Sequence, residues 1–179
     1  MKKFIVLFLL CATLRVPAQQ IVTRNAYIGF FSKTPLEDIK AENNQANAVL
    51  DLSKQNIAFA VLMKGFLFKK ELMQEHFNEN YIESDQFPKA TFTGMYSGVV
   101  DAVKEGTYNV TVKGQLTLHG VTRPLEVPAV IAIQGGKVNA KTNFSLKPQD
   151  FNIEIPALVR EKIAPQIAVA VNADFQLTK

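Results

Sequence analysis

The stretch TYNVTVKGQLTL at Thr107–Leu118 decides the fold, because its side chains alternate between two classes over its whole length. The even positions are Tyr108, Val110, Val112, Gly114, Leu116 and Leu118, and the odd positions are polar. A period of two places successive side chains on opposite faces of an extended strand, whereas a helix repeats every 3.6 residues. We therefore expect one long β-strand here, with its even-numbered side chains facing a core.

The residues that follow continue this pattern. After a turn at His119-Gly120, Leu125–Ile133 alternates again, and Gly135-Gly136 provides the two positive φ angles of a tight hairpin turn. Val138–Leu146 and Ile167–Leu177 then alternate in the same way. Alternating strands joined by tight turns predict an antiparallel meander.

The N-terminal half has strand-like composition with less regular alternation. The strands expected there are Tyr27–Phe31, Leu36–Ala41, Ala46–Leu52, Ile57–Met63 and Phe92–Val100. The total is about eight or nine strands, a number at which a closed barrel is filled by side chains or holds one small ligand. With 179 residues, 47% of them hydrophobic, the chain suits one all-β domain: an antiparallel barrel of about eight strands.

One segment near residues 69–82 has helical rather than strand periodicity. Leu72, Met73, Phe77 and Tyr81 recur at intervals of one and four residues, with Lys, Glu, Gln and Asn between them. This spacing predicts one amphipathic helix whose only apolar stripe faces the barrel, as a lid or plug that controls access to the interior.

The segment just before this helix is unusually apolar. Ile57–Met63 is apolar on both faces, which suits a strand between the barrel interior and the covering helix. Phe66 and Phe68 follow it, spaced for one face of an extended chain. These two rings lead into the apolar stripe of the helix.

The first 18 residues have the layout of a secretory signal peptide. Met1-Lys2-Lys3 is basic, Phe4–Leu14 is an apolar run, and Val16-Pro17-Ala18 provides small residues for cleavage after Ala18. Leu10 precedes Cys11 where a lipoprotein signal requires a small residue, so we expect Cys11 to be removed with the signal. The predicted mature domain is therefore 19–179, periplasmic or secreted.

Composition excludes several classes of function for that mature chain. Loss of Lys2, Lys3 and Arg15 leaves 17 basic and 16 acidic residues, and no block of five like charges occurs, so a nucleic-acid partner is not indicated. No apolar run reaches the roughly 18–20 residues of a membrane span, so stable membrane insertion is not expected. The single Cys excludes a disulfide framework.

The sequence offers little material for catalysis. It contains no G-x-S-x-G elbow and no phosphate-binding glycine loop. His76 and Glu79, with Glu83 and His119, form the one set of residues that could hold a metal or act as acid and base. Zinc sites take three or four ligands and only two His are present, so we expect no metal, no cofactor and no catalytic residue. We expect both histidines to be hydrogen-bonding struts instead.

Two long motifs resemble the YceI-like family. They are HFNENYIESDQFPKATFTG at His76–Gly94 and GQLTLHGVTRPLEV at Gly114–Val127, and SKTPLEDIKAEN at Ser32–Asn43 resembles a Bacteroidetes-type branch of that family. The resemblance covers essentially the whole mature chain. It departs from the family at Lys147–Ile153, where KPQDFNI replaces the Asp-Phe-Gly-Ile-like turn with its preceding basic residue.

The resemblance implies an exported, lipocalin-like antiparallel barrel that binds a long isoprenoid or other amphiphilic lipid in an apolar tunnel. Combined with the alternation, it predicts which side chains contact the lipid. The predicted lipid-binding residues are Ile28, Phe30, Phe59, Val61, Met63, Phe66, Phe68, Leu72, Met73, Phe77, Tyr81, Phe92, Tyr108, Val110, Val112, Ile131, Ile133, Phe144, Val169 and Val171.

Alternative functions stay open at this point. One is a cofactor-free enzyme that acts on such a lipid through His76 or His119. Another is a closed barrel, filled by its own side chains, that serves as an interaction module. The sequence also leaves a homodimer open.

Overall fold

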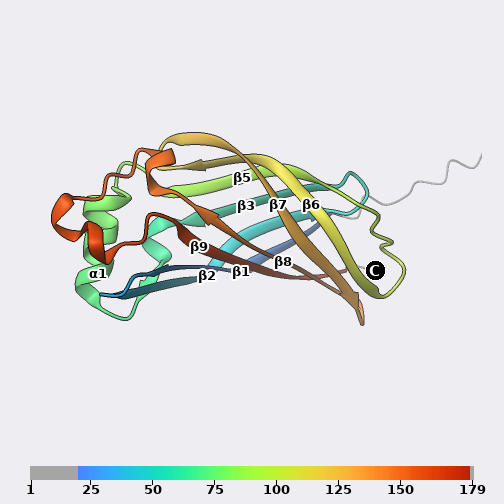
Figure 1. Cartoon of the computed structure of the whole chain (residues 1–179). Helices are drawn as coiled ribbons and strands as arrows, with labels where there is room; N and C mark the ends of the chain where they lie inside the picture. The colour runs from blue at the N-terminus through green and yellow to red at the C-terminus, as the bar shows by residue number, and fades with distance from the viewer. Residues whose placement is uncertain (1–19, 178–179) are drawn as a thin grey trace, which may run out of the picture.

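The computed structural model describes residues 20–177, which form nine strands, one short α-helix and four further helical turns (Figure 1). The predicted signal peptide lies outside these residues. The strands are β1 (Gln20–Lys33), β2 (Asp38–Asp51), β3 (Asn56–Leu62), β4 (Leu67–Phe68), β5 (Lys89–Ser97), β6 (Gly106–Leu118), β7 (Val121–Gln134), β8 (Lys137–Leu146) and β9 (Ile167–Gln176). The helical elements are η1 (Met63–Gly65), α1 (Glu71–His76), η2 (Phe77–Tyr81), η3 (Pro148–Phe151) and η4 (Ala157–Lys162).

Eight of the strands close into an antiparallel barrel. Their order is β1-β9-β8-β7-β6-β5-β3-β2, and β1 pairs with β2 to complete the circle, while the two-residue β4 adds to β2. The predicted all-β antiparallel barrel is confirmed. Closure removes the exposed strand edges of an open sheet.

The hairpins at the C-terminal half follow the predicted turns. β6 and β7 pair continuously from Gly106↔Ile133 to Leu118↔Val121. Their turn residues His119 and Gly120 have φ angles of 49° and 71°, and Gly135 and Gly136, between β7 and β8, have 56° and 75°. Two successive positive φ angles match the right-handed twist of the flanking strands, which explains the tight connections.

Two predicted strands in the N-terminal half are one strand. Leu36–Ala41 and Ala46–Leu52 were expected to be separate, because the polar run ENNQ lies between them. In the structure β2 continues through this run. Asn43 is buried, and its Nδ2 donates to the Leu62 carbonyl oxygen at 3.1 Å while its Oδ1 accepts from Gln45 N at 2.8 Å. A buried amide with both ends satisfied does not interrupt a strand.

The predicted helix is shorter than expected and changes type. α1 covers only Glu71–His76, and Ile82 N then donates to the Phe77 carbonyl oxygen at 2.9 Å, the five-residue spacing of a π-helical turn. Asn78 Nδ2 donates to the Gln74 carbonyl oxygen at 2.9 Å, replacing a main-chain donor where the turn widens.

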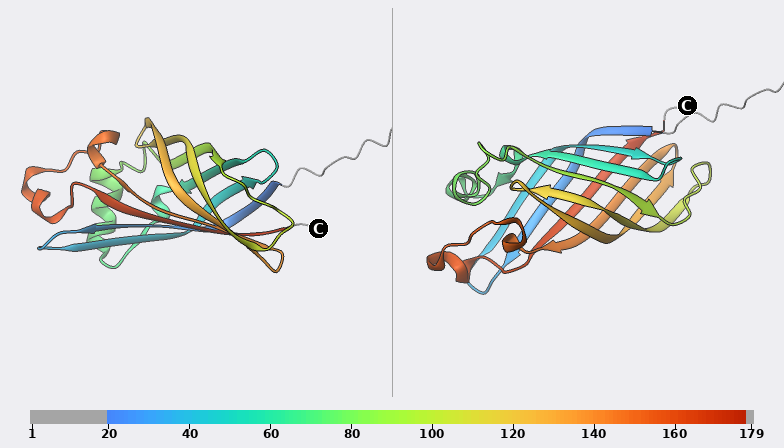
Figure 2. Two further views of the ribbon diagram at one scale, coloured as in Figure 1. Left: turned by 45° about the vertical axis from the view of Figure 1, so that its right-hand side comes forward. Right: turned by 90° about the horizontal axis from the view of Figure 1, so that it is seen from above.

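The two ends of the barrel differ (Figures 1 and 2). The closed end carries the short turns 52–55, 98–105 and 135–136. The mouth end carries the β1–β2 turn, the segment 63–88 with α1, and the segment 147–166 with η3 and η4. The two longest connections, 63–88 and 147–166, therefore both cover the mouth end.

The wall of the barrel opens toward the mouth end. The β7–β8 ladder runs from Gln134↔Lys137 to Val130↔Lys141 and stops there, although β8 continues to pair with β9 as far as Leu146↔Ile167. β7 and β8 separate beyond this point (Figure 1). η3 lies against β7, where Arg123 Nε donates to the Asp150 carbonyl oxygen at 2.9 Å.

Candidate ligand-binding cavity

A large apolar cavity of about 550 Å³ occupies the mouth half of the barrel. This volume lies within the roughly 300–1,000 Å³ typical of small-molecule sites. Aliphatic and aromatic side chains from the inward faces of the strands and from α1, η2, η3 and η4 form its wall. Polar side chains enter the lining mainly near the mouth.

The cavity brings together sixteen of the twenty positions that were predicted to contact lipid. These are Ile28, Phe30, Phe59, Val61, Met63, Phe66, Phe68, Leu72, Met73, Phe77, Tyr81, Phe92, Val112, Phe144, Val169 and Val171. They come from seven strands, from the lid formed by α1 and η2, and from the turn before it. The alternation in the sequence therefore predicted which side chains of these strands point into the cavity; whether they contact a lipid stays a prediction.

The other four positions, Tyr108, Val110, Ile131 and Ile133, do not line the cavity. Val110, Ile131 and Ile133 are buried, but they pack at the closed end with Phe175, which is 1% exposed. The Tyr108 ring packs against the same core, and its hydroxyl lies 2.8 Å from the Lys104 carbonyl oxygen. These residues face inward where side chains fill the barrel, so no space remains beside them.

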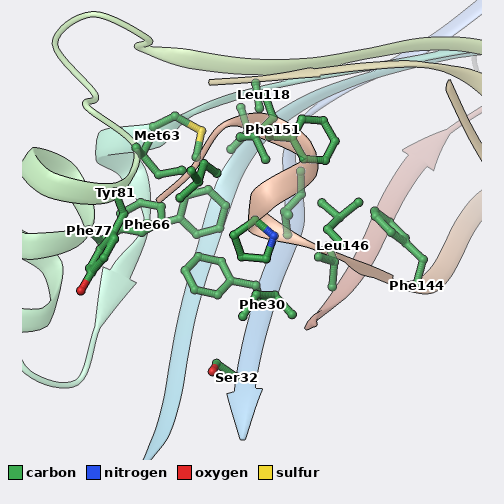
Figure 3. A pocket seen from close by; sticks show the side chains of 18 of the residues that line it. Phe30, Ser32, Met63, Phe66, Phe77, Tyr81, Leu118, Phe144, Leu146 and Phe151 are labelled. Atoms are coloured by element: carbon green, nitrogen blue, oxygen red, sulfur yellow. The ribbon is translucent and has the colours of Figure 1, made fainter. Parts of the chain in front are cut away.

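Four phenylalanine rings pack together where the lid meets the barrel. Phe30 of β1 lies 5.3 Å from both Phe66 and Phe77, and Phe68 lies 5.1 Å from Phe77, measured between ring centroids. The rings are tilted or edge-on, the arrangements that aromatic quadrupoles favour. Figure 3 shows Phe30, Phe66 and Phe77 grouped beside Met63 and Tyr81. This cluster ties the lid to the wall of the cavity.

The apolar stripe of the lid is only partly turned inward. Phe77 is buried, Met73 and Tyr81 are half-buried, and burial raises the pKa of the Tyr81 hydroxyl. Leu72, in contrast, is 61% exposed at the edge of the cavity. The expectation that all four side chains face the barrel is wrong for Leu72, because α1 ends after six residues and its first turn stands at the mouth.

The side chains at the mouth are mostly hydrogen-bond donors. Lys70 Nζ lies 2.8 Å from Glu37 Oε1, and the exposed Lys162 also lines the cavity. The buried Ser32 accepts from Ala164 N at 2.8 Å, which fastens the segment after η4 to β1. We call Ser32, Glu37, Lys70 and Lys162 the rim.

The two histidines have different surroundings. His119 is 9% exposed; its Nδ1 donates to the Phe151 carbonyl oxygen at 3.0 Å, and its Nε2 lies 2.9 Å from Glu83 Oε2. The Phe87 ring packs edge-on against it at 4.5 Å. His119 is therefore the strut that was predicted. His76 is exposed and lines the cavity, and within residues 20–177 its ring makes no hydrogen bond, so the strut role predicted for it is not seen.

The His119 strut joins three strained connections at the mouth end. Glu83, His119 and Asn152 have φ angles of 48°, 49° and 55°, the left-handed region that non-glycine residues seldom adopt. Asn tolerates this region better than most residues, which explains how Asn152 can occupy this turn. No group of three or more metal-ligating side chains occurs among the described residues, although the chain brings Glu83 and His119 together.

Part of the lining was missed from the sequence. Four residues on the predicted inward faces line the cavity, although they were left out of the predicted lipid contacts: Leu116, Leu118, Leu125 and Val127. Phe151, Ile153 and Ile155 also line the cavity, and their alternation was a usable signal. Val159 and Ile163 of the η4 region follow no strand period, so only their apolar character pointed to them.

The fold and the cavity define the class of structure: a closed antiparallel barrel, filled at one end and hollow at the other. Residues 19–175 match the YceI-like domain, and the chain belongs to this family. A curated relative, UPF0312 protein YE1254 of Yersinia enterocolitica, is 32% identical over 82 residues, which cover 42% of this chain. The match spans only 40% of that relative's length.

Solved structures share the fold at low sequence identity. A polyisoprenoid binding domain from Saccharophagus degradans superimposes with a TM-score of 0.76 at 12% identity, covering 90% of this chain and 99% of that one. BcnA of Burkholderia cenocepacia gives 0.69 at 16% identity, with coverages of 83% and 95%. The YCEI protein of Campylobacter jejuni gives 0.62 at 15% identity, with 78% and 85%. In the described part of the chain, no helix has the length and hydropathy of a membrane span.

Proposed function

We propose that this chain is an exported lipid-binding protein that holds an isoprenoid-type or other long amphiphilic lipid in its cavity, for carriage, storage or sequestration. The observation that carries the proposal is the cavity itself: about 550 Å³ of apolar space inside the barrel, with polar side chains at its mouth. This distribution matches an amphiphile whose tail points into the barrel. The polyisoprenoid binding of the Saccharophagus degradans domain, which has the same fold, supports the choice of ligand.

The energetics of such binding are favourable without any catalytic group. Each buried CH₂ contributes about 0.8 kcal/mol, so a chain of ten or more carbons offsets the entropy lost on association. The rings of Phe30, Phe66 and Phe77 extend the apolar surface that the tail contacts. The affinity for the lipid would increase with the length of its tail until the cavity is filled.

The alternative of a lipid-converting enzyme has less support. Both ring nitrogens of His119 are engaged, by Phe151 and by Glu83, and the ring is buried outside the cavity lining. His76 reaches the cavity but has no carboxylate partner within residues 20–177. A binding role therefore accounts for more of the site than an acid–base role does.

Native mass spectrometry of the protein purified from its host compartment tests the proposal. We expect a non-covalent adduct with the mass of a long-chain lipid, which organic extraction removes and added farnesol or palmitate restores as adducts of their own mass. A protein that carries no lipid and binds none of these probes would exclude the proposal. The same sample tests export, since its first residue should be Gln19.

A further inference from the structure

The charges of the rim are unevenly distributed. The charged side chains that line the cavity are Glu37, Lys70, Lys141 and Lys162. Lys141 lies apart, where the β7–β8 ladder ends, so the rim itself holds two lysines and one glutamate. Lys70 is already paired with Glu37 at 2.8 Å.

Glu37 is held in its ionised form by its neighbours. The hydrogen bond from Lys70 lowers the pKa of the Glu37 carboxyl, and the charges of Lys70 and Lys162 lower it further against the opposing effect of desolvation. Lys162 is therefore near enough to act on Glu37, yet it forms no ion pair in the part of the chain that the structure describes. One positive charge of the rim is left without a close partner.

Ser32 adds a donor of a different kind. It is 2% exposed and lines the cavity, and its Oγ accepts from Ala164 N. A hydroxyl that accepts one bond still has its own hydrogen to donate. The rim thus offers one buried hydroxyl and two ammonium groups, while its only carboxylate is already bonded to Lys70.

We infer that the amphiphile bound by this chain carries an anionic headgroup, a phosphate or carboxylate, that lies at the rim on Lys162, Lys70 and Ser32. This inference rests on the proposed function, because it assigns a headgroup to a ligand whose tail fills the cavity. An anion satisfies the donors of the rim, and its hydrogen bonds with ammonium groups are stronger than those of a neutral hydroxyl. A neutral alcohol offers Lys162 no opposite charge.

Two probes that share a tail test the inference: farnesyl phosphate and farnesol, each titrated against a neutral fluorescent probe bound to the protein. We expect farnesyl phosphate to bind about tenfold more tightly, the equivalent of one charge-assisted hydrogen bond. The ratio of the two affinities should shrink as salt rises from about 0.05 M to about 0.5 M, because the rim is exposed to solvent.

Variants of Lys162 show whether this lysine causes the preference for farnesyl phosphate over farnesol. Lys162→Gln should lower the affinity ratio about threefold or more, and Lys162→Glu should reverse the preference. Lys162 is exposed, so neither variant threatens folding. Lys104→Gln, an exposed lysine at the closed end, is the matched control and should keep the wild-type ratio.

The outcomes separate the two proposals. Equal affinity for both probes, or a ratio unaffected by Lys162, would overturn the anionic headgroup and leave the lipid-binding function standing. Failure of both probes to bind, in a protein that also carries no lipid and binds no palmitate, would overturn both. Inorganic phosphate alone should not compete; if it does so as well as farnesyl phosphate, the rim is a site for free anions and the headgroup assignment is wrong.

Discussion

Val110 and Val112 lie two positions apart on the inward face of β6, yet they face different surroundings. Val112 lines the cavity, and Val110 packs in the filled closed end. Val112→Phe should therefore place its ring in open space, reducing affinity for a long-chain probe about tenfold with little loss of stability. Val110→Phe should instead cost about 1–3 kcal/mol through overpacking and leave affinity unchanged.

Urea unfolding and probe titration of both variants check this prediction. The pair controls itself, since the same side chain is introduced on the same strand face. Equal loss of stability in the two variants would mean that the cavity wall at Val112 is as tightly packed as the closed end.

Single residues also show the limits of reading the sequence. The sequence identified His119 as a hydrogen-bonding residue, because it lies in a tight turn and has few chemical partners nearby. The sequence did not predict the partners of His119, because Glu83 and Phe151 lie 36 and 32 residues away along the chain. Only the closure of the barrel brings them together. Contacts of this kind depend on how separate connections meet at one end of the fold.

Among the elements, the β2–β3 turn has a stability that depends on pH. Asp51 is 5% exposed, and its Oδ1 accepts from Ser53 Oγ at 2.7 Å, Lys54 N at 2.9 Å and Ser53 N at 3.0 Å. The Ser53 hydroxyl, followed by these backbone donors, lowers the pKa of the Asp51 carboxyl. The folded state therefore binds the proton less tightly than the unfolded state.

The stabilisation that the ionised Asp51 carboxylate gives the folded state should be complete above the pKa of the unfolded state, about 4. It should disappear as the pH falls through the lower pKa of the folded state. Asp51→Asn should accordingly reduce the free energy of unfolding more at neutral pH than at about pH 3. Denaturant unfolding of both proteins across that range measures the difference. A gap that is constant with pH would contradict the role given to the carboxylate.

The lid is the element on which ligand affinity should depend most. Phe77→Ala removes the ring that contacts Phe30, Phe66 and Phe68, so it should weaken probe binding and lower the rise in Tm at a given probe concentration. Leu72→Ala on the same lid is the control; because Leu72 is 61% exposed, its effect on stability should stay within about 0.5 kcal/mol. Thermal unfolding with increasing probe measures both. An unchanged rise in Tm for Phe77→Ala would remove the lid from the binding site.

Elements differed in how far the sequence predicted them. β6, β7 and β8 follow strict alternation and tight turns, so their positions were predictable within a few residues. β2 was not, because its buried Asn43 looks like a loop residue until its two partners are known. η4 was not predicted either, since no periodic pattern marks Ala157–Lys162, and the segment after it is fastened by Ser32 of a strand distant in sequence.

At the scale of the whole molecule, the sequence predicted the barrel but not where it is hollow. The same alternation runs along β6 from the closed end to the mouth. Whether space remains depends on the side chains that reach across from the opposite wall: Phe175 and Tyr96 are buried in the closed end, while the walls separate beyond Val130↔Lys141. Cavity volume is thus set by pairs of residues far apart in the chain.

The filled closed end has a consequence for the order of events in the proposed function. Val110, Ile131, Ile133 and Phe175 block the inner end of the cavity, so a tail cannot leave at one end while another arrives at the other. A second lipid can therefore enter only after the bound lipid has left through the mouth. The rate of exchange would then equal the dissociation rate of the bound lipid, at any concentration of competing lipid. The dissociation rate alone would set the mean residence time of each lipid.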